Sequence, residues 1–321
     1  MAIYTKLTEK EIKDFLALYG MALLEHEGIA AGVQNTNYFI RSDKGKFILT
    51  VYEEGIDLAD LPFFCGAMEH MHKAGVKCPC PLRSLDGKNV NPLHGKSAGL
   101  VNFLEGNFTH LITAEQCGAL GALMAQMHLA AESFKMTRKN PLSLEGLKKL
   151  YSKIHKMDEL RPRLKKEISD ELAFIEKNTP PGLPSGLIHA DIFPDNVFFD
   201  GGEVSGIIDF FFSCADSYVY DFAVTVNAWC FDGAGGDWEF VEPKFEAMLA
   251  AYEKLRPLSA AEKAALPLML RRAAVRFFLT RAYDKLYPKP GAVVGVKNPF
   301  EYTAKIEFFR NAGGRILELL K

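Results

Sequence analysis

A chain of 321 residues is longer than one typical domain, so we expect two domains or lobes. The composition is 48% apolar and 24% charged, which is ordinary for a globular protein with a sizeable core. The formal net charge is −2, and nothing in the sequence indicates the basic stripe that nucleic-acid and membrane-surface binders normally need, so neither partner is expected. There is no signal-peptide pattern and no apolar run long enough to span a bilayer, which predicts a soluble, cytoplasmic protein.

The six cysteines do not indicate a disulfide framework, because the chain is long and carries no export pattern. Cys78 and Cys80 form the one close pair. A metal site at this pair lacks a second pair of ligands nearby in the sequence. Burial as small apolar residues is therefore the favoured interpretation.

The first hundred residues predict a small antiparallel sheet with one main helix. A capping box at Thr8–Glu11, followed by apolar residues at helical spacing, predicts a short opening helix that Gly20 ends. The main helix is expected at about 58–74. Strands are expected at 23–29, 33–41, 46–52, around Leu82 and at 97–103.

From residue 105 onward the pattern becomes mainly helical, with capping boxes at Thr113–Gln116 and Ser259–Glu262. The one pair of strands expected in this half flanks residues 187–199. Further helices are expected at 143–156, 164–178, 217–230, 239–254, 259–286 and 299–320. The sequence thus predicts an α+β protein with a small antiparallel β lobe at 1–104 and a larger, mainly helical lobe at 105–321.

The most informative stretch is Leu187–Phe199, where a polar loop lies between two apolar runs. His189, Asp191 and Asn196 lie on this loop, and Asp209 follows the next apolar run. The spacing H-x-D-x-x-x-x-N, with a later Asp-Phe, is typical of a kinase-type phosphotransfer site. Turn chemistry alone explains the Pro-Asp-Asn part of the loop, including Asp195, but not the second acidic position after a buried strand.

Phosphoryl transfer needs a carboxylate that orients the attacking hydroxyl and oxygen ligands for a metal ion on the triphosphate. Asp191 is the predicted catalytic base, and Asn196 and Asp209 are the predicted metal ligands. His189 either braces the loop or is a satisfied core histidine. The predicted cofactors are ATP and Mg²⁺.

These motifs resemble the aminoglycoside phosphotransferase and choline kinase group, small-molecule kinases that share a bilobal protein-kinase-like fold. The resemblance implies that the first lobe binds nucleotide and that the second carries the catalytic and substrate-binding residues. Tyr220-Asp221-Phe222-Ala223 is similar to the start of the helix that follows the metal motif in that group. This implies that Asp221 supports the catalytic loop, although helix capping also explains an aspartate there.

Four longer stretches are similar to bacterial homoserine kinases of this fold, and the resemblance spreads over nearly the whole chain. The stretches are 61–64, 187–199, 227–231 and 276–284. They imply ATP-dependent phosphorylation of L-homoserine to O-phospho-L-homoserine, a step of threonine biosynthesis. The alternatives are a kinase of choline, an aminoglycoside or another amino alcohol, and a non-catalytic nucleotide-binding protein.

The resemblance also places the nucleotide site. Gly28 and Gly32 occupy the position of the glycine-rich hairpin over the phosphates, although a plain β-turn explains them equally. Thr50 stands where such kinases have a lysine, and the helix at 58–74 has no evident glutamate partner, so the usual Lys–Glu pair is absent. The hinge expected to meet adenine is formed by Asn102, Phe103 and Leu104.

An amino-acid acceptor carries an ammonium and a carboxylate, so its pocket should offer an acidic and a basic group. Arg281 is favoured for the carboxylate, because arginine binds carboxylates through two parallel hydrogen bonds. A salt bridge to Asp284 or to a helix end explains Arg281 as well. The candidate substrate-binding residues are Asn35, Asn37, Asp216, Asn227, Trp229 and Arg281.

Overall fold

The computed structural model describes residues 3–30, 35–53, 55–109, 111–234, 237–288 and 297–321. They form two compact units, the first of Met1–Gly106 with Ser205–Phe211, and the second of Asn107–Val204 with Phe212–Lys321. The first break lies two residues beyond the boundary predicted from the sequence. Ser205–Phe211 belongs to the first unit, although the sequence places it among residues of the second.

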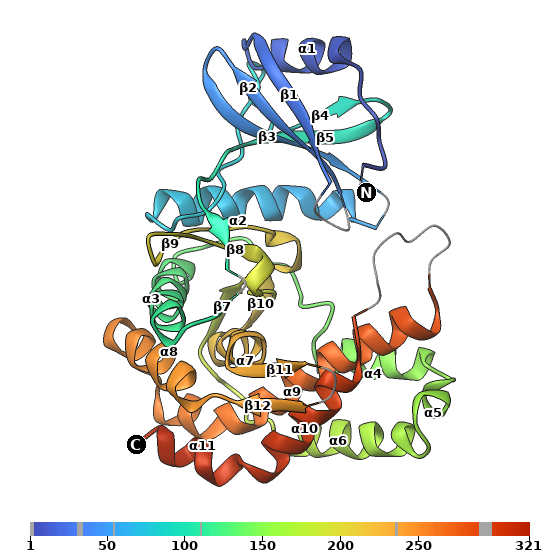
Figure 1. Cartoon of the computed structure of the whole chain (residues 1–321), viewed down its shortest axis with the longest axis vertical. Coiled ribbons are helices and arrows are strands. Elements are labelled where there is room, and N and C mark those ends of the chain that lie inside the picture. The colour runs from blue at the N-terminus through green and yellow to red at the C-terminus, as the bar shows by residue number, and fades with distance from the viewer. Residues whose placement is uncertain (1–2, 31–34, 54, 110, 235–236, 289–296) are drawn as a thin grey trace. The chain divides into compact units, whose positions relative to one another are not determined.

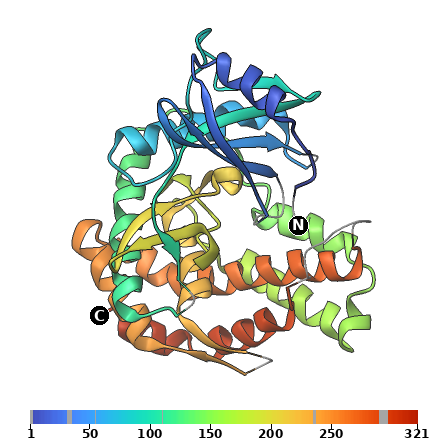
Figure 2. The same cartoon turned by 45° about the horizontal axis from the view of Figure 1, so that its top comes forward.

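The first unit contains a five-stranded antiparallel sheet in the order β1-β2-β3-β5-β4. The strands are β1 (Leu23–Ile29), β2 (Thr36–Ser42), β3 (Gly45–Tyr52), β4 (Val90–Leu93) and β5 (Lys96–Asn102). Helix α1 (Glu9–Ala17) covers one face of the sheet (Figures 1 and 2). Its predicted capping box is confirmed, because the Thr8 side chain accepts a hydrogen bond from the Glu11 amide.

The core of this unit lies between α1 and the sheet. Ile12, Phe15 and Leu16 of α1 are buried against alternate strand residues such as Ile40 and Leu49. Successive strand side chains point to opposite faces, so one face of the sheet is apolar and covered by α1. The other face has half-buried side chains.

The fourth strand does not lie where the sequence predicted it. Around Leu82 the chain runs beside β5 through one isolated bridge, Pro81 to Val101, and one bond from the Leu82 amide to the Leu100 carbonyl at 2.8 Å. The strand that pairs with β5 in a ladder is β4 instead, with Val90 opposite Gly99 and Leu93 opposite Lys96.

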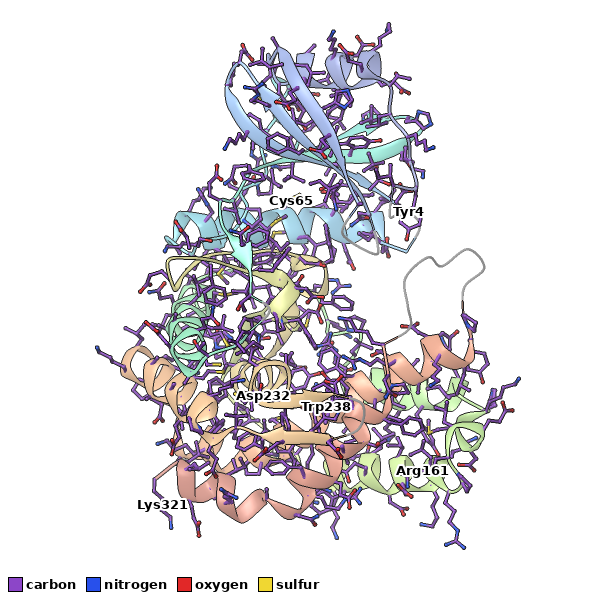
Figure 3. All side chains as sticks on the ribbon, viewed as in Figure 1. Tyr4, Cys65, Arg161, Asp232, Trp238 and Lys321 are labelled. Atoms are coloured by element: carbon purple, nitrogen blue, oxygen red, sulfur yellow. The ribbon has the colours of Figure 1, made fainter. Side chains whose placement is uncertain are left out.

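The main helix of the first unit is α2 (Leu61–Lys73), preceded by the 3₁₀ turn η1 (Leu58–Asp60). Cys65 lies on this helix (Figure 3). All six cysteines are free thiols, and the buried Cys78 donates to the Met68 carbonyl. Within the described ranges, no group of three or more His, Cys, Asp and Glu side chains is placed to hold a metal ion.

The second unit is mainly helical, as predicted. Its helices are α3 (Ala114–Ala131), α4 (Leu144–Lys153), α5 (Met157–Leu160), α6 (Leu164–Asn178), α7 (Tyr218–Trp229), α8 (Glu242–Leu255), α9 (Ala260–Leu286), α10 (Phe300–Asn311) and α11 (Gly313–Leu319). The predicted capping boxes at the starts of α3 and α9 are confirmed. In the part of the chain that the structure describes, no helix is both long and apolar enough to cross a membrane.

Short strands accompany these helices. β6 (Asn107–Phe108) pairs with β8 (Val197–Asp200), and β7 (Ser185–Ile188) pairs with β10 (Cys214–Ser217). β11 (Phe231–Ala234) pairs with β12 (Asp237–Phe240). β9 (Glu203–Ile207) begins in the second unit and ends in the first.

The β11–β12 hairpin shows that the prediction of strands only beside residues 187–199 was wrong. Figure 3 shows Asp232 and Trp238 on its two strands. The helix predicted at 239–254 therefore starts later, at Glu242. The helix predicted at 299–320 is two helices that are separated at Ala312, and the second of them begins with two glycines, which have low helix propensity.

Helix α9 is the centre of the second unit, with α7 and α10 packed along it (Figure 1). Buried residues occur around its whole circumference rather than along one stripe. A helix that is buried on all sides is expected at the centre of a large domain and is usually apolar there. Its buried arginines are therefore the exceptions that need an explanation.

The close packing of α3 against α8 gives a test of this fold. A Cβ atom at Gly121 would overlap the main-chain oxygen of Met248, so we expect Gly121→Ala to lower the free energy of unfolding by about 1–3 kcal/mol. Gly118 is the matched control on the same helix, because its added Cβ would lie 3.5 Å from the Ala247 oxygen. Gly118→Ala should be neutral or gain up to about 1 kcal/mol from helix propensity. Urea unfolding of both variants measures the difference, and equal stabilities would contradict this packing.

Candidate active site

The loop with the predicted catalytic residues connects β7 to β8. His189 and Ala190 are buried, whereas the side chain of Asp191 is 18% exposed. Ala190 has a φ of 63°, a left-handed conformation that is uncommon for any residue but glycine. The amide of Asp191 donates to His189 Nδ1 at 3.3 Å, a contact that fits both a bracing residue and a satisfied core histidine.

Asn196 closes this loop at the end of the 3₁₀ turn η2 (Pro194–Asn196). Its Nδ2 donates to the main-chain oxygen of Asp191 at 2.9 Å and lies 3.4 Å from Asp191 Oδ2. The Nδ2 group of Asn196 therefore bonds to the loop. Among the described residues, none donates a hydrogen bond to its carbonyl oxygen Oδ1. A neutral amide oxygen of this kind suits a hard divalent cation. Asp195 is exposed and lies 3.3 Å from Lys297, in keeping with a turn residue.

Asp221 accepts hydrogen bonds from the backbone of the loop. It lies in the first turn of α7 and is completely buried. Its Oδ1 accepts the amide of Ala190 at 2.7 Å, and its Oδ2 accepts the amide of His189 at 3.1 Å. Asp221 therefore binds the loop backbone, and capping of its own helix is not needed to explain it.

A chain of buried polar groups orients Asp221 in turn. His128 on α3 contacts Asp221 Oδ2 through Nε2 at 3.1 Å and the hydroxyl of Tyr252 through Nδ1 at 2.7 Å. Arg256 donates to the same hydroxyl at 2.9 Å and to Glu262, also at 2.9 Å. Each donor in this chain of hydrogen bonds meets an acceptor when His128 carries its proton on Nε2. Burial raises the pKa of Asp221, but the hydrogen bond and charge of His128, the nearby His189 and the Ala190 amide together lower it more, so the pKa is lowered overall.

Two further side chains hold the other side of the loop. Arg276 on α9 donates from Nη1 to the main-chain oxygen of Ala190, and its Nη2 lies 3.4 Å from Asp191 Oδ1. Trp229 at the end of α7 donates from Nε1 to the main-chain oxygen of Ile192 at 3.0 Å. The sequence interpretation did not assign Arg276 a role. The available signal was a single arginine inside the apolar run from Ala273 to Leu279.

The structure gives Asn227 and Trp229 roles other than the predicted contact with substrate. Both side chains are completely buried. Asn227 Nδ2 donates to the oxygens of Ala223 at 2.9 Å and Leu270 at 3.1 Å, which joins α7 to α9. Trp229 supports the loop, as described above. In this structure both side chains therefore have partners within the second unit, and their contact with substrate stays a prediction.

Arg281 and Asp216 also have protein partners. Arg281 donates to Glu301 at 2.6 Å, in the first turn of α10, so the alternative of an ion pair at a helix end describes it. Asp216 accepts both terminal nitrogens of Arg272, at 3.2 and 2.6 Å, and Asn140 Nδ2 at 2.7 Å. Burial raises the pKa of Asp216, but Arg272 together with the hydrogen bonds from Asn140 and the Ser217 amide lowers it more, so the pKa is lowered overall. Its carboxylate is already largely satisfied by protein donors.

The predicted phosphate-binding glycines lie at the tip of β1 and beyond it. Gly28 pairs with Tyr38 across the β1–β2 ladder. A Cβ atom at Gly28 would meet only the flexible end of the Ile3 side chain, so this contact does not by itself require a glycine. Gly32 lies outside the described residues.

Asn35 and Asn37 lie in the first unit and bond to its own groups. Asn35 is buried and accepts the amide of Glu53 at 3.2 Å. Asn37 accepts the hydroxyl of Thr50 at 2.8 Å, across the β2–β3 ladder. Thr50, which stands at the position expected for a lysine, thus meets a strand neighbour.

The predicted hinge follows the end of β5. The amide of Cys80 donates to Asn102 Oδ1 at 2.5 Å, which ties the hinge to the preceding extended segment. The amide of Phe103 donates to the oxygen of Lys46 at 3.2 Å, and the ring of Phe103 packs edge-on against Phe39. A Cβ atom at Gly206 would overlap the side chain of Leu104. The absence of a side chain at Gly206 therefore lets β9 approach the hinge closely.

Asp209 follows β9 in the first unit and begins the turn that leads into η3 (Phe210–Phe212). It is half-buried and has a φ of 66°. Aspartate tolerates this left-handed conformation better than most residues. Phe211, two residues on, packs edge-on against Phe64 and Tyr52 of the same unit, which fixes this segment.

The profile of the phosphotransferase enzyme family matches residues 25–258. The chain belongs to this family. It is therefore an enzyme of phosphoryl transfer, as the loop motif predicted.

Full-length relatives of this phosphotransferase are named homoserine kinase. The relative from Rhizobium meliloti is 46% identical over 312 residues, an alignment that covers 97% of this chain and 95% of the relative. The relative from Paramagnetospirillum magneticum is 45% identical over 322 residues, which is 98% of each chain.

Solved structures share the fold of this phosphotransferase at low identity. An amicoumacin kinase in complex with AMP-PNP and Ca²⁺ has a TM-score of 0.65 and 16% identity, and the match covers 97% of this chain and 94% of that one. A spectinomycin phosphotransferase in complex with ADP and spectinomycin has the same TM-score and identity over 98% of both chains. The predicted protein-kinase-like α+β fold is confirmed.

Proposed function

We propose that this phosphotransferase transfers the γ-phosphoryl group of ATP to the side-chain hydroxyl of L-homoserine and forms O-phospho-L-homoserine, a step of threonine biosynthesis. The observation that carries the proposal is the 46% identity, over 97% of the chain, to a protein named homoserine kinase. The loop geometry supports it, because a partly exposed carboxylate on a braced loop is what an alcohol acceptor needs.

Asp191 is the proposed catalytic base. As the hydroxyl oxygen forms its bond to the γ-phosphorus, the bond to the bridging oxygen breaks and ADP leaves. The proton of the hydroxyl passes to the Asp191 carboxylate. His189, Asp221 and Asn196 fix the position of that carboxylate through the loop backbone.

Mg²⁺ is the proposed metal, and Asn196 and Asp209 are its proposed protein ligands. The oxygen Oδ1 of Asn196 fits this role, since the Nδ2 atom of the same amide is the one that bonds to the loop. The metal ion would neutralise charge on the phosphates of ATP. The first unit, with Asn102, Phe103 and Leu104 at its hinge, is the proposed nucleotide-binding unit.

The test is ADP release, coupled to an optical assay, with a panel of hydroxyl acceptors. L-homoserine should give the highest kcat/KM. L-serine is the matched control, because it lacks one methylene group and should be about 10–200-fold poorer. A higher kcat/KM for choline or an aminoglycoside would overturn the proposed acceptor. Metal-dependent ATP binding without ADP release for any acceptor would support a non-catalytic nucleotide-binding protein instead.

A further inference from the structure

We propose that Arg276 is a positioning residue for phosphoryl transfer, which holds the Ala190–Asp191 peptide so that the Asp191 carboxylate faces the acceptor hydroxyl. This inference rests on the proposed role of Asp191 as the base, but not on which hydroxyl compound is the acceptor. It assigns a role in the reaction to a residue of α9, far from the loop in sequence.

Arg276 meets the loop at two adjacent points. Nη1 donates to the oxygen of Ala190, and Nη2 lies 3.4 Å from Asp191 Oδ1. One planar guanidinium therefore contacts both the carbonyl oxygen of Ala190, the residue that precedes the proposed base, and the carboxylate of the base itself. A rigid fork with two donors fixes an orientation, which a single point charge does not.

The loop needs such a restraint because Ala190 is held in an unfavourable conformation, with φ at 63°. Asp221 binds the amide hydrogen of Ala190 at 2.7 Å, and Arg276 binds the carbonyl oxygen of the same residue. Both polar groups of this one strained residue are thus fixed by buried charged side chains from two different helices. Loss of either partner allows the peptide to rotate and changes the direction of the Asp191 side chain.

The surroundings of Arg276 make it rigid. The side chain is 2% exposed, and its guanidinium carbon lies 4.4 Å from the centre of the Phe277 ring and 5.3 Å from that of Phe212. Aromatic rings stack well on a flat guanidinium and less well on an ammonium. A lysine at this position keeps the charge but loses the stacking and one of the two contacts.

The test compares Arg276→Lys with Arg271→Lys. Arg271 is a matched control on the same helix, because it is also largely buried, binds Glu171 through two nitrogens and stacks on Phe174 at 4.0 Å. We expect Arg276→Lys to lower kcat about 100-fold, the effect of a small misplacement of a reacting group, with KM for ATP changed less than about twofold. Arg271→Lys should leave both constants within about twofold. A kcat for Arg276→Lys within twofold of wild type would overturn the proposal.

A double-mutant cycle with Asp191→Asn separates positioning from general loss of structure. If Arg276 acts through Asp191, Arg276→Lys should lower kcat much less in the Asp191→Asn background than in the wild type. Equal effects in both backgrounds would show that Arg276 acts independently of Asp191 and would overturn the proposal. All rates are measured with whichever acceptor gives wild-type enzyme its highest rate, so a failure of homoserine as acceptor is seen separately in the wild-type panel.

Discussion

Replacement of Asp191 by asparagine is expected to lower kcat by about 10²–10⁴-fold while the affinity for the metal–ATP complex stays nearly unchanged. An amide accepts no proton from the acceptor hydroxyl. In the wild type, Asn196 Nδ2 and Arg276 Nη2 each lie 3.4 Å from one carboxylate oxygen of Asp191. The NH₂ group of the new asparagine would replace one of these oxygens and would therefore place a donor against a donor. Coupled ADP release measures the rate, and calorimetric titration with nucleotide measures the affinity.

Asp195→Asn is the matched control for this variant. Asp195 lies on the same loop and undergoes the same change of carboxylate to amide, but its side chain is 65% exposed and meets only Lys297 in the described chain. Its kcat should remain within about twofold of wild type. Near-normal turnover of Asp191→Asn would remove Asp191 from the role of base, and equal losses in both variants would point to damage of the loop instead.

Replacement of Asp221 by alanine is expected to lower the free energy of unfolding by about 3–5 kcal/mol and to abolish most activity. It would leave the amides of His189 and Ala190 buried without acceptors. His128 Nε2 would also lose its contact with the Asp221 carboxylate. Urea unfolding gives the stability. Asp170→Ala is the control, because Asp170 is exposed and forms an i,i+4 pair with Lys166, so its removal should cost less than about 0.5 kcal/mol.

The pH dependence of the Asp221 effect has a defined sign. The pKa of Asp221 is lowered in the folded state, so its contribution is fully present above the unfolded pKa of about 4 and is lost as the pH falls through the folded pKa. The difference in stability between wild type and Asp221→Ala should therefore shrink below about pH 4. A difference that stays constant down to strongly acidic pH would contradict a buried, ionised Asp221.

Much of the fold and of the catalytic loop could be predicted from the sequence, because their signals are local. The three capping boxes lie within four residues each, and the loop motif holds His189, Asp191 and Asn196 within eight residues. The partners of the loop could not be found in this way. His128 lies 93 positions from Asp221, and Arg276 lies 86 positions from Ala190, so only the packing of α3, α7 and α9 brings them together.

The residues that bind substrate are harder to recognise in the sequence than the catalytic loop, for a related physical reason. Polar side chains inside a helical unit are expected to find partners in the unit itself. Asn227, Trp229 and Arg281 each have such partners, and a sequence pattern does not separate a polar group that binds a ligand from one that joins two helices. The β11–β12 hairpin escaped prediction because its strands have only four residues each, too few for a periodic signal.

The membership of Ser205–Phe211 in the first unit has a consequence for synthesis on the ribosome. Within that unit, the amide of Ile207 bonds to the Lys77 oxygen at 2.9 Å, and Phe211 packs on the ring of Phe64. These contacts form only after roughly 100 further residues have followed Gly106 out of the ribosome, which takes roughly 5–20 s at ordinary elongation rates. During that interval the nascent first unit exposes the apolar surface that Phe211 later covers, and chaperones that bind nascent chains should recognise it there.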